Sequence, residues 1–233
     1  MDTFLNIVYA LAIICAIAIA IWSNLRSGGS GKSFLLRQDG INTPDSPTRF
    51  AIEQSLSQVF RATLRQLDTV VVAPNKQWFY AELVVDFIES PHRDPSYWKV
   101  ETSYRVFARR LAKPAPEIAL DNRRHGSVNP LYAYGWKIKN GELVYCEAAF
   151  MDRFKLYCHP GSEAEVLSLL APDALVTILD NMTGTDMYIV GDHLYCIMPN
   201  RYVSNKRIEQ VFSQTEAIVR ELDTNLPRAA ARH

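Results

Sequence analysis

The feature that most constrains the fold of this chain is an uncharged apolar run, Phe4 to Trp22, near its start. Asn6 is its one strongly polar interruption. As a helix, roughly 19 residues extend about 28 Å, close to the hydrocarbon thickness of a bilayer. Trp22 suits a membrane interface, and Arg26 can extend its charge to water. The run therefore predicts a single transmembrane helix in contact with the lipid bilayer, followed by a globular part.

The alternative interpretation of this run is a cleaved secretory signal peptide. Such a peptide has a basic start, a shorter apolar core and a cleavage site of small residues. Here Asp2 is the one charged side chain ahead of the run, and the run is longer than an ordinary signal-peptide core. We expect an uncleaved anchor, and cleavage stays open as the alternative.

The charges that flank the run predict its orientation. The segment before it carries no Lys or Arg, whereas Arg26, Lys32 and Arg37 follow it. The positive-inside rule therefore predicts a cell-membrane protein whose large C-terminal part lies in the cytoplasm. Cysteine usage agrees with a reducing compartment, because an odd number remains outside the run, where the cysteines are Cys146, Cys158 and Cys196, with Cys15 inside it.

The overall charge gives no sign of a nucleic-acid partner. The chain has 25 basic and 25 acidic residues, so no global field attracts phosphate. Its basic pairs are scattered and are expected on a solvated surface: Arg109-Arg110, Arg123-Arg124 and Lys206-Arg207. We expect no nucleic acid among the partners.

Composition divides the chain into four parts. Residues 1–25 form the tail and anchor, and residues 26–45 are expected to be a flexible linker because they are rich in Gly, Ser and turn formers. Residues 46–226 form one α+β domain, with two small lobes as the alternative, divided near 113–130 where the sequence is loop-rich. Residues 227–233 are expected to be a disordered tail, since Pro227 is expected to end the last helix.

Several helices can be placed from their start signals. Ser46 is expected to cap a helix with Pro47 in its first turn, and Ser162 with Glu165 matches a capping box. Pro172 begins another helix. A C-terminal amphipathic helix has an apolar stripe that we expect to pack on a sheet: Ile208, Val211, Phe212, Ile218, Val219 and Leu222.

Strands are expected over residues 67–73, 78–89, 97–111 and 141–158. Residues 98–108 alternate strictly, with Trp98, Val100 and Thr102 on one side and Lys99, Glu101 and Ser103 on the other, which is typical of a half-buried antiparallel strand. Residues 187–190 and 194–197 flank Gly191-Asp192-His193, a hairpin signal. The predicted fold class is α+β: an N-terminal transmembrane helix followed by a cytosolic domain with a mainly antiparallel sheet, short helices and the C-terminal amphipathic helix.

Residues 28–33, Gly-Gly-Ser-Gly-Lys-Ser, resemble part of a nucleotide-binding P-loop. That loop requires a glycine where this chain has Arg26, and it follows a buried strand rather than a membrane helix. We therefore interpret these residues as linker.

Two groupings of Cys and His could bind metal or supply a nucleophile. Cys158-His159 is one, and His193 with Cys196 is the other. On a strand, residues three apart point to opposite faces, so His193 and Cys196 are not expected to share an ion. Buried thiols and a turn histidine are the ordinary interpretation.

Carboxylates on the expected strands could face each other across a cleft, as an acid–base pair would. They are Glu82, Asp86, Glu89 and Glu101. Cross-strand pairing of Glu82 or Asp86 with Arg105 or Lys99 is the commoner arrangement. Aromatic residues could likewise line a groove or simply pack in the core: Trp78, Trp98, Tyr132, Tyr134 and Trp136.

Residues Pro116 to Pro199 resemble an uncharacterised bacterial family of single-pass membrane-tethered proteins, classified as a domain of unknown function. The resemblance rests on Phe150 with Phe154-Lys155-Leu156-Tyr157, on Leu169-Leu170-Ala171-Pro172-Asp173, and on Tyr188 to Tyr195. It implies a membrane anchor with a cytosolic α+β domain, and it implies no reaction or catalytic residue.

The sequence thus predicts a membrane-anchored, non-enzymatic domain that binds another protein or acts as a membrane-proximal scaffold. The alternative is a membrane-tethered enzyme whose Cys/His or carboxylate site is assembled from distant strands. No residue is assigned a catalytic, cofactor-binding or metal-binding role, and no cofactor is expected.

Overall fold

The computed structural model describes residues 34–60, 63–89, 98–122, 141–182, 184–198 and 203–230. The predicted anchor, Phe4–Trp22, lies outside these residues, and so do residues 28–33, Tyr132, Tyr134 and Trp136. Within the described ranges, no helix has the length and apolar character needed to cross a membrane.

The domain is built on one nine-stranded sheet, in which every neighbouring pair is antiparallel. The strand order is β1-β2-β3-β4-β9-β8-β5-β7-β6. The strands are β1 (Ile41–Asn42), β2 (Thr63–Val72), β3 (Trp78–Glu89), β4 (Trp98–Arg110), β5 (Ile118–Asn122), β6 (Glu142–Val144), β7 (Phe154–Cys158), β8 (Asp186–Val190) and β9 (His193–Met198). The α+β class with a large antiparallel sheet is therefore confirmed.

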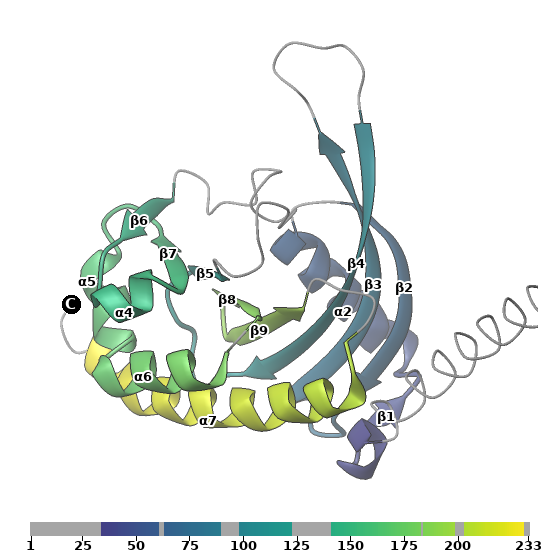
Figure 1. Cartoon of the computed structure of the whole chain (residues 1–233). Coiled ribbons are helices and arrows are strands. Elements are labelled where there is room, and N and C mark those ends of the chain that lie inside the picture. Colours follow the sequence, from purple (N-terminus) through teal and green to yellow (C-terminus); the bar gives the residue numbers. More distant parts are fainter. Residues whose placement is uncertain are drawn as a thin grey trace, which may run out of the picture.

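Helices cover both faces of the sheet. The face that α2 (Ser46–Phe60) covers holds one core, to which Ile52, Leu56 and Val59 contribute. The other core lies beneath four helices: α4 (Ala148–Met151), α5 (Glu163–Leu169), α6 (Pro172–Asn181) and α7 (Asn205–Ala230). Figure 1 shows α7 running along the bottom of the view, below α6, while α2 lies against β2. The arrangement is helix, sheet, helix.

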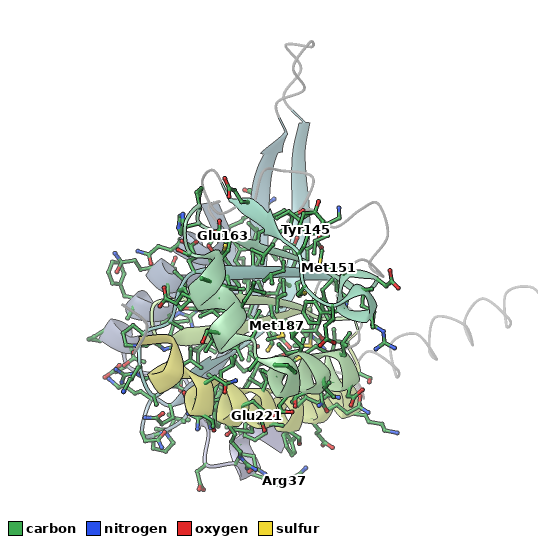
Figure 2. All side chains as sticks on the ribbon, turned by 90° about the vertical axis from the view of Figure 1, so that its left-hand side faces the viewer. Arg37, Tyr145, Met151, Glu163, Met187 and Glu221 are labelled. Carbon is green, nitrogen blue, oxygen red and sulfur yellow. The ribbon has the colours of Figure 1, made fainter. Side chains whose placement is uncertain are left out.

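The two edges of the sheet lie at opposite ends of the domain. Arg37, just before β1, lies at the bottom of the side view, and Tyr145, just after β6, lies towards its top (Figure 2). Both edge strands are short, which limits the backbone that each offers for pairing with another chain.

Burial on both faces alters the expectation for β4. The strand was expected to be half-buried, but Phe107, on its predicted polar side, is buried beneath α7 and packs against Phe212 at a ring distance of 5.1 Å. α7 contacts β4 and β9 directly, and Ile208, Val211, Ile218 and Leu222 are buried there. The C-terminal helix therefore packs on the sheet, as predicted.

The first described residues belong to the fold. Residues 34–37 form a helical turn, Leu35 is fully buried in the core beneath α7, and β1 pairs with the end of β2. The chain passes so close to the sheet at Gly40 that a Cβ atom there would lie 2.6 Å from both the Leu35 carbonyl oxygen and Val71 Cγ1. The expected linker, residues 26–45, thus contributes residues 34–45 to the domain.

Two helix caps differ from the prediction. Asp45, not Ser46, caps α2, since its Oδ1 accepts a hydrogen bond from the backbone N–H of Thr48 at 2.9 Å. α5 begins where the capping box predicted, but the Ser162 side chain makes no capping bond. Glu163 Oε1 instead accepts from the Gly161 N–H at 3.0 Å, in the turn that precedes the helix.

Two element predictions were wrong. The expected strand 141–158 is interrupted by α4, where Ala148, Ala149 and Phe150 lack the period of two and Phe150 stacks on Phe154. Residues 118–120 lie in the stretch that was expected to be loop-rich, and they form β5, which pairs with both β7 and β8. β5 lies within residues 113–130, where the division into two lobes was considered, and it belongs to the single sheet.

Pro227 does not end α7, which continues to Ala230. A proline near a helix C-terminus removes one backbone donor while the preceding turns stay anchored by packing. Here Leu226 is buried, and Asn225 donates a side-chain hydrogen bond to the Leu169 carbonyl at 3.1 Å. The residues from 227 that were expected in a disordered tail therefore begin as helix.

Candidate functional site

A cavity of about 310 Å³ lies between the first half of α2 and the sheet. We call it the α2 pocket. Its lining residues are Asp45, Pro47, Thr48, Ala51, Ile52, Ser55, Val72, Lys76, Trp78, Phe79 and His193. Its walls are mainly apolar, and a few polar groups converge on it, which is the usual composition of a small-molecule site.

Three parts of the fold meet at this pocket. α2 contributes Ala51, Ile52 and Ser55, of which Ala51 and Ser55 lie about one turn apart. The turn between β2 and β3 contributes Lys76. The hairpin between β8 and β9 contributes His193. The pocket therefore depends on residues far apart in the sequence.

The hairpin places His193 beside a carboxylate. Its turn is Gly191-Asp192, and Gly191 has φ +60°, the left-handed conformation that a type II′ turn requires at its first central position. Asp192 Oδ1 lies 2.7 Å from His193 Nδ1, and Asp192 Oδ2 accepts a hydrogen bond from Arg110 Nε at 2.7 Å. Arg110, Asp192 and His193 thus form a polar chain that ends at the pocket.

The environment keeps Asp192 ionised. Partial burial tends to raise the pKa of its carboxyl group, but the hydrogen bond from Arg110 and the nearby charges of His193 and Arg110 outweigh burial. The net pKa lies below the ordinary value. The carboxylate can therefore orient the His193 ring through Nδ1, which leaves Nε2 for another partner.

A second polar pair lies at the α2 wall. The Ser55 hydroxyl and the Tyr195 hydroxyl share a hydrogen bond, and the Tyr195 ring lies 6.0 Å from that of His193. Burial raises the pKa of the Tyr195 phenol, so its hydroxyl stays protonated. The pair fixes α2 against β9 and keeps a hydroxyl group of Ser55 at the pocket wall.

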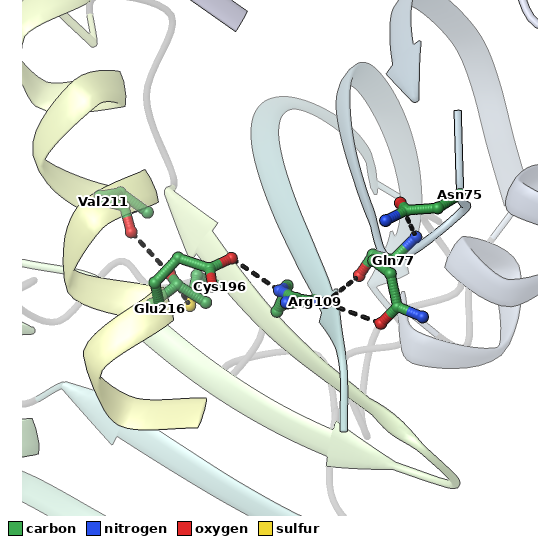
Figure 3. Close-up of polar contacts among 7 residues, drawn as sticks. Asn75, Gln77, Arg109, Cys196, Val211 and Glu216 are labelled. Atoms are coloured by element: carbon green, nitrogen blue, oxygen red, sulfur yellow. Dashed lines mark hydrogen bonds and ion pairs between the residues drawn. The ribbon is translucent and has the colours of Figure 1, made fainter. Parts of the chain in front are cut away.

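The turn that carries Lys76 is held from the opposite face of the sheet. Arg109 Nη1 donates to the Gln77 backbone oxygen at 3.0 Å and to Gln77 Oε1 at 2.9 Å, and Arg109 Nε donates to Glu216 of α7 at 2.6 Å (Figure 3). The Gln77 N–H in turn donates to Asn75 Oδ1 at 3.1 Å. Lys76 itself has φ +56°, a backbone conformation that residues other than glycine rarely adopt. These bonds hold the turn in that conformation.

The basic pair Arg109-Arg110 was expected on a solvated surface. This holds for Arg110, whose side chain is 51% exposed, but not for Arg109, whose side chain is 20% exposed. Successive residues of a strand point to opposite faces, so Arg109 bonds towards α7 and Arg110 towards Asp192. Both hold turns that form the α2 pocket.

The predicted cross-strand pair of carboxylate and arginine is confirmed. Glu82 lies opposite Arg105, with Glu82 Oε1 3.2 Å from Arg105 Nε, and the Tyr80 hydroxyl donates to the same Glu82 oxygen at 2.7 Å. A shallow second cavity of about 300 Å³ beside this pair is lined by Gln66, Asp68, Glu82, Leu83, Val84, Ser103, Tyr104 and Arg105. Asp86 pairs in register with Glu101 rather than with a basic residue.

The Cys/His groupings are not assembled into a site. Cys196 lies on the α7 side of the sheet, where its Sγ is 3.2 Å from Thr215 Oγ1, whereas His193 faces the α2 pocket. This confirms that the two point to opposite faces. Cys158 Sγ donates to the His159 carbonyl, and the His159 ring contacts Glu117 at 2.7 Å. No group of three His, Cys, Asp or Glu side chains among the described residues is placed to hold a metal ion.

Burial makes two of these thiols unreactive. It raises the pKa of Cys196 to about 12 and that of Cys158 to about 11, in the second case with help from the charges of Glu163 and Glu142. At neutral pH both groups are thiols, which are poor nucleophiles.

Sequence reasoning missed the α2 pocket. It treated His193 as a turn residue, and it did not single out Ser55, Lys76 or Asp192 as site residues. A usable signal was present in Asp192-His193, a carboxylate beside an imidazole in a hairpin. Nothing in the sequence indicated Arg110 as the third member, because that contact depends on the pairing of β4 with β9.

No family model and no curated protein matches the sequence. Among solved structures, the chain is similar to the crystal structure of the mycobacterial trehalose monomycolate transport factor A, TtfA, with a TM-score of 0.46 and 9% identity. The aligned region covers 84% of this chain and 92% of that one. At this TM-score we infer nothing from the likeness.

Proposed function

We propose that this chain is a single-pass membrane protein whose cytoplasmic α+β domain binds a partner molecule at the α2 pocket and holds it near the bilayer. The observation that supports binding is the pocket itself, an apolar cavity of about 310 Å³ with a few oriented polar groups at its walls. The apolar run Phe4–Trp22 supports the anchor, and its basic flank supports the orientation.

The start of the fold supports a position close to the membrane. Leu35 is buried in the domain, so residues 23–33 are all that separates the proposed anchor from the folded part. Even fully extended, such a segment spans at most about 40 Å. The α2 pocket includes Asp45 and Pro47, which follow this segment closely in the sequence.

A binding role accounts for the pocket better than catalysis by cysteine. The alternative predicted from the sequence is a membrane-tethered enzyme with a Cys/His pair. Cys158 and Cys196, however, are buried thiols that face away from His193. The Asp192–His193 contact is the one feature that favours an enzyme, since it orients an imidazole as a general base requires. No nucleophile of raised reactivity lies beside it among the described residues.

The anchor and its orientation are tested by fractionation and protease protection. After carbonate washing of membranes, the chain should remain in the membrane fraction. Protease added to intact spheroplasts should leave the domain whole, and it should digest the domain after lysis. Digestion before lysis would show the reverse orientation, and release by carbonate would exclude the anchor.

Binding at the α2 pocket is tested by photocrosslinking in cells. Benzoylphenylalanine at Thr48, which lines the pocket, should form an adduct that intact-mass spectrometry detects whatever its size. The control is the same group at Val176 on α6, a residue that is 50% exposed and outside the pocket. Equal adducts at both positions, or none at Thr48, would exclude the pocket as the binding site.

A further inference from the structure

Within the described part of the chain, the carboxylates around the α2 pocket have protein partners, whereas two of its nitrogen groups do not. Both carboxylates there are already bonded to the protein. Asp45 accepts hydrogen bonds from the Thr48 side chain and backbone, which lower its pKa together with the charge of Lys76, and Asp192 is bonded to Arg110 and His193. The acceptors of the site are therefore satisfied without a ligand.

Among the described residues, two nitrogen groups at the pocket are bonded to no other protein group. Within the described ranges, neither Lys76 Nζ nor His193 Nε2 has a hydrogen-bond partner, although both residues line the pocket. Lys76 is exposed at the rim of the pocket, where its charge lies near that of Asp45. An ammonium group and a ring nitrogen at the wall of an apolar cavity are complementary to an acidic oxygen.

Building on the proposed binding role, we propose that the α2 pocket binds a small monocarboxylic acid with an apolar body. The ligand binds as its carboxylate and one proton is taken up from solution: Lys76 Nζ meets one ligand oxygen, and the proton lies between the other oxygen and Nε2. The apolar body lies against Ile52, Val72 and Phe79, which line the pocket and keep only a small part of their surface exposed. Because Asp192 already holds Nδ1, the imidazole is oriented before the ligand arrives.

The size of the cavity restricts the ligand. The cavity volume of about 310 Å³ is at the small end of the range for ligand pockets, which begins at about 300 Å³. It suits an acid with one ring or a short chain better than a dinucleotide. A single carboxylate is also all that Lys76 and His193 can neutralise, because Asp45 and Asp192 would repel a second one.

The test is calorimetric titration of the full chain in lipid nanodiscs, with empty nanodiscs as the background. The probe is 4-phenylbutyrate, and its matched neutral control is 4-phenylbutyramide. We expect the acid to bind with a Kd below about 1 mM, within the range that ligands of this size reach. The amide should bind at least about tenfold weaker, which corresponds to about 1.4 kcal/mol. Equal binding of acid and amide, or no binding of the acid, would overturn the proposal.

Variants locate the binding. Lys76→Asn removes the ammonium group while keeping a residue that tolerates the left-handed φ, and it should weaken the acid about tenfold. Lys113→Asn removes an exposed lysine outside the pocket and should change nothing. Ala51→Trp should abolish binding by filling the cavity. If Lys76→Asn behaves as Lys113→Asn does, or if Ala51→Trp still binds the acid, the site is elsewhere and the proposal is wrong.

Two further outcomes separate this proposal from the ones on which it rests. If a peptide with a C-terminal phenylalanine binds and the free acid does not, the small-acid proposal is wrong, and the ligand is the C-terminus of a protein. A chain that fails to float with the nanodiscs would count against the anchor, while the comparison of acid with amide would still decide the ligand. Circular dichroism spectra of each variant should match the parent, which excludes unfolding as the cause of lost binding.

Discussion

Arg109 Nε lies 2.6 Å from Glu216 Oε1, and this contact joins β4 to the middle of α7. The same guanidinium also bonds the turn at Gln77, so one side chain ties together a helix, a strand and a turn. The two side chains are only 20% and 25% exposed, so water competes with the pair less than it does at an open surface.

A double-mutant cycle on this pair should show coupling. We expect Arg109→Met and Glu216→Gln to destabilise the full chain individually and to be coupled by about 1 kcal/mol, because each leaves the other's charge partly buried. Thermal unfolding in detergent measures the effect. Arg220→Met, on the exposed side of α7, is the control and should lie within about 0.5 kcal/mol of the parent. Additive single effects would mean that the contact contributes nothing.

Phe212→Ala should destabilise the domain by about 2–3 kcal/mol, less than the roughly 3–5 kcal/mol typical of a fully buried phenylalanine. The ring is only half-buried, but it packs edge-on against Phe34 and Trp78, at 5.7 and 5.6 Å. The melting temperature measures the loss. Phe50→Ala, where the side chain is 67% exposed, should leave it unchanged. Equal effects of the two changes would contradict the packing role of Phe212.

Truncation should locate the beginning of the folded unit. Removing residues 1–33 should yield a soluble, folded domain, since the described fold begins at residue 34. Removing residues 1–43 also deletes Leu35 and β1, and loss of the buried leucine alone should cost about 2–5 kcal/mol. Urea unfolding followed by fluorescence compares the two proteins. Equal midpoints would show that residues 34–43 do not stabilise the domain.

Alkylation should distinguish the three described cysteines. Cys146 is partly exposed, whereas Cys158 and Cys196 are buried with pKa values raised to about 11 and about 12. A thiol reacts as its thiolate, so the rate rises with pH, and burial raises the pKa of Cys146 as well. In a Cys15→Ser background, iodoacetamide at pH 8 should modify Cys146 first, as peptide mass spectrometry would show. Faster labelling of Cys158 or Cys196 in the folded chain would contradict their burial.

The sequence predicted the elements whose patterns are local. β3 has the expected bounds, Trp78–Glu89, and the hairpin around Gly191 was found from its turn residues. α4 and β5 were missed because short segments have too few residues to show a period. Phe107 was placed on a polar face because alternation reports one side of a strand and cannot show that α7 covers the other.

The candidate site was less predictable than the fold. Arg110 and Asp192 are 82 residues apart, and they meet only because β9 is inserted beside β4. No local pattern specifies that strand order. The sequence shows Asp192 and His193 as neighbours, but it does not show that His193 lines a pocket. That pocket exists because α2 forms its opposite wall.

The strand order also bears on how the chain assembles during synthesis. The two halves of the sheet join along β4 and β9, where Arg105 pairs with Met198 and Arg110 with His193. A ribosome must therefore complete β5, β6, β7 and β8 before β4 gains its second neighbour, and α7, which covers this junction, is made later still. Until then β4 has an open edge beside apolar residues, the kind of surface that chaperones protect in slowly folding β proteins. The nascent chain is thus exposed to mispairing at β4 from the time that this strand emerges until β9 and α7 have been made.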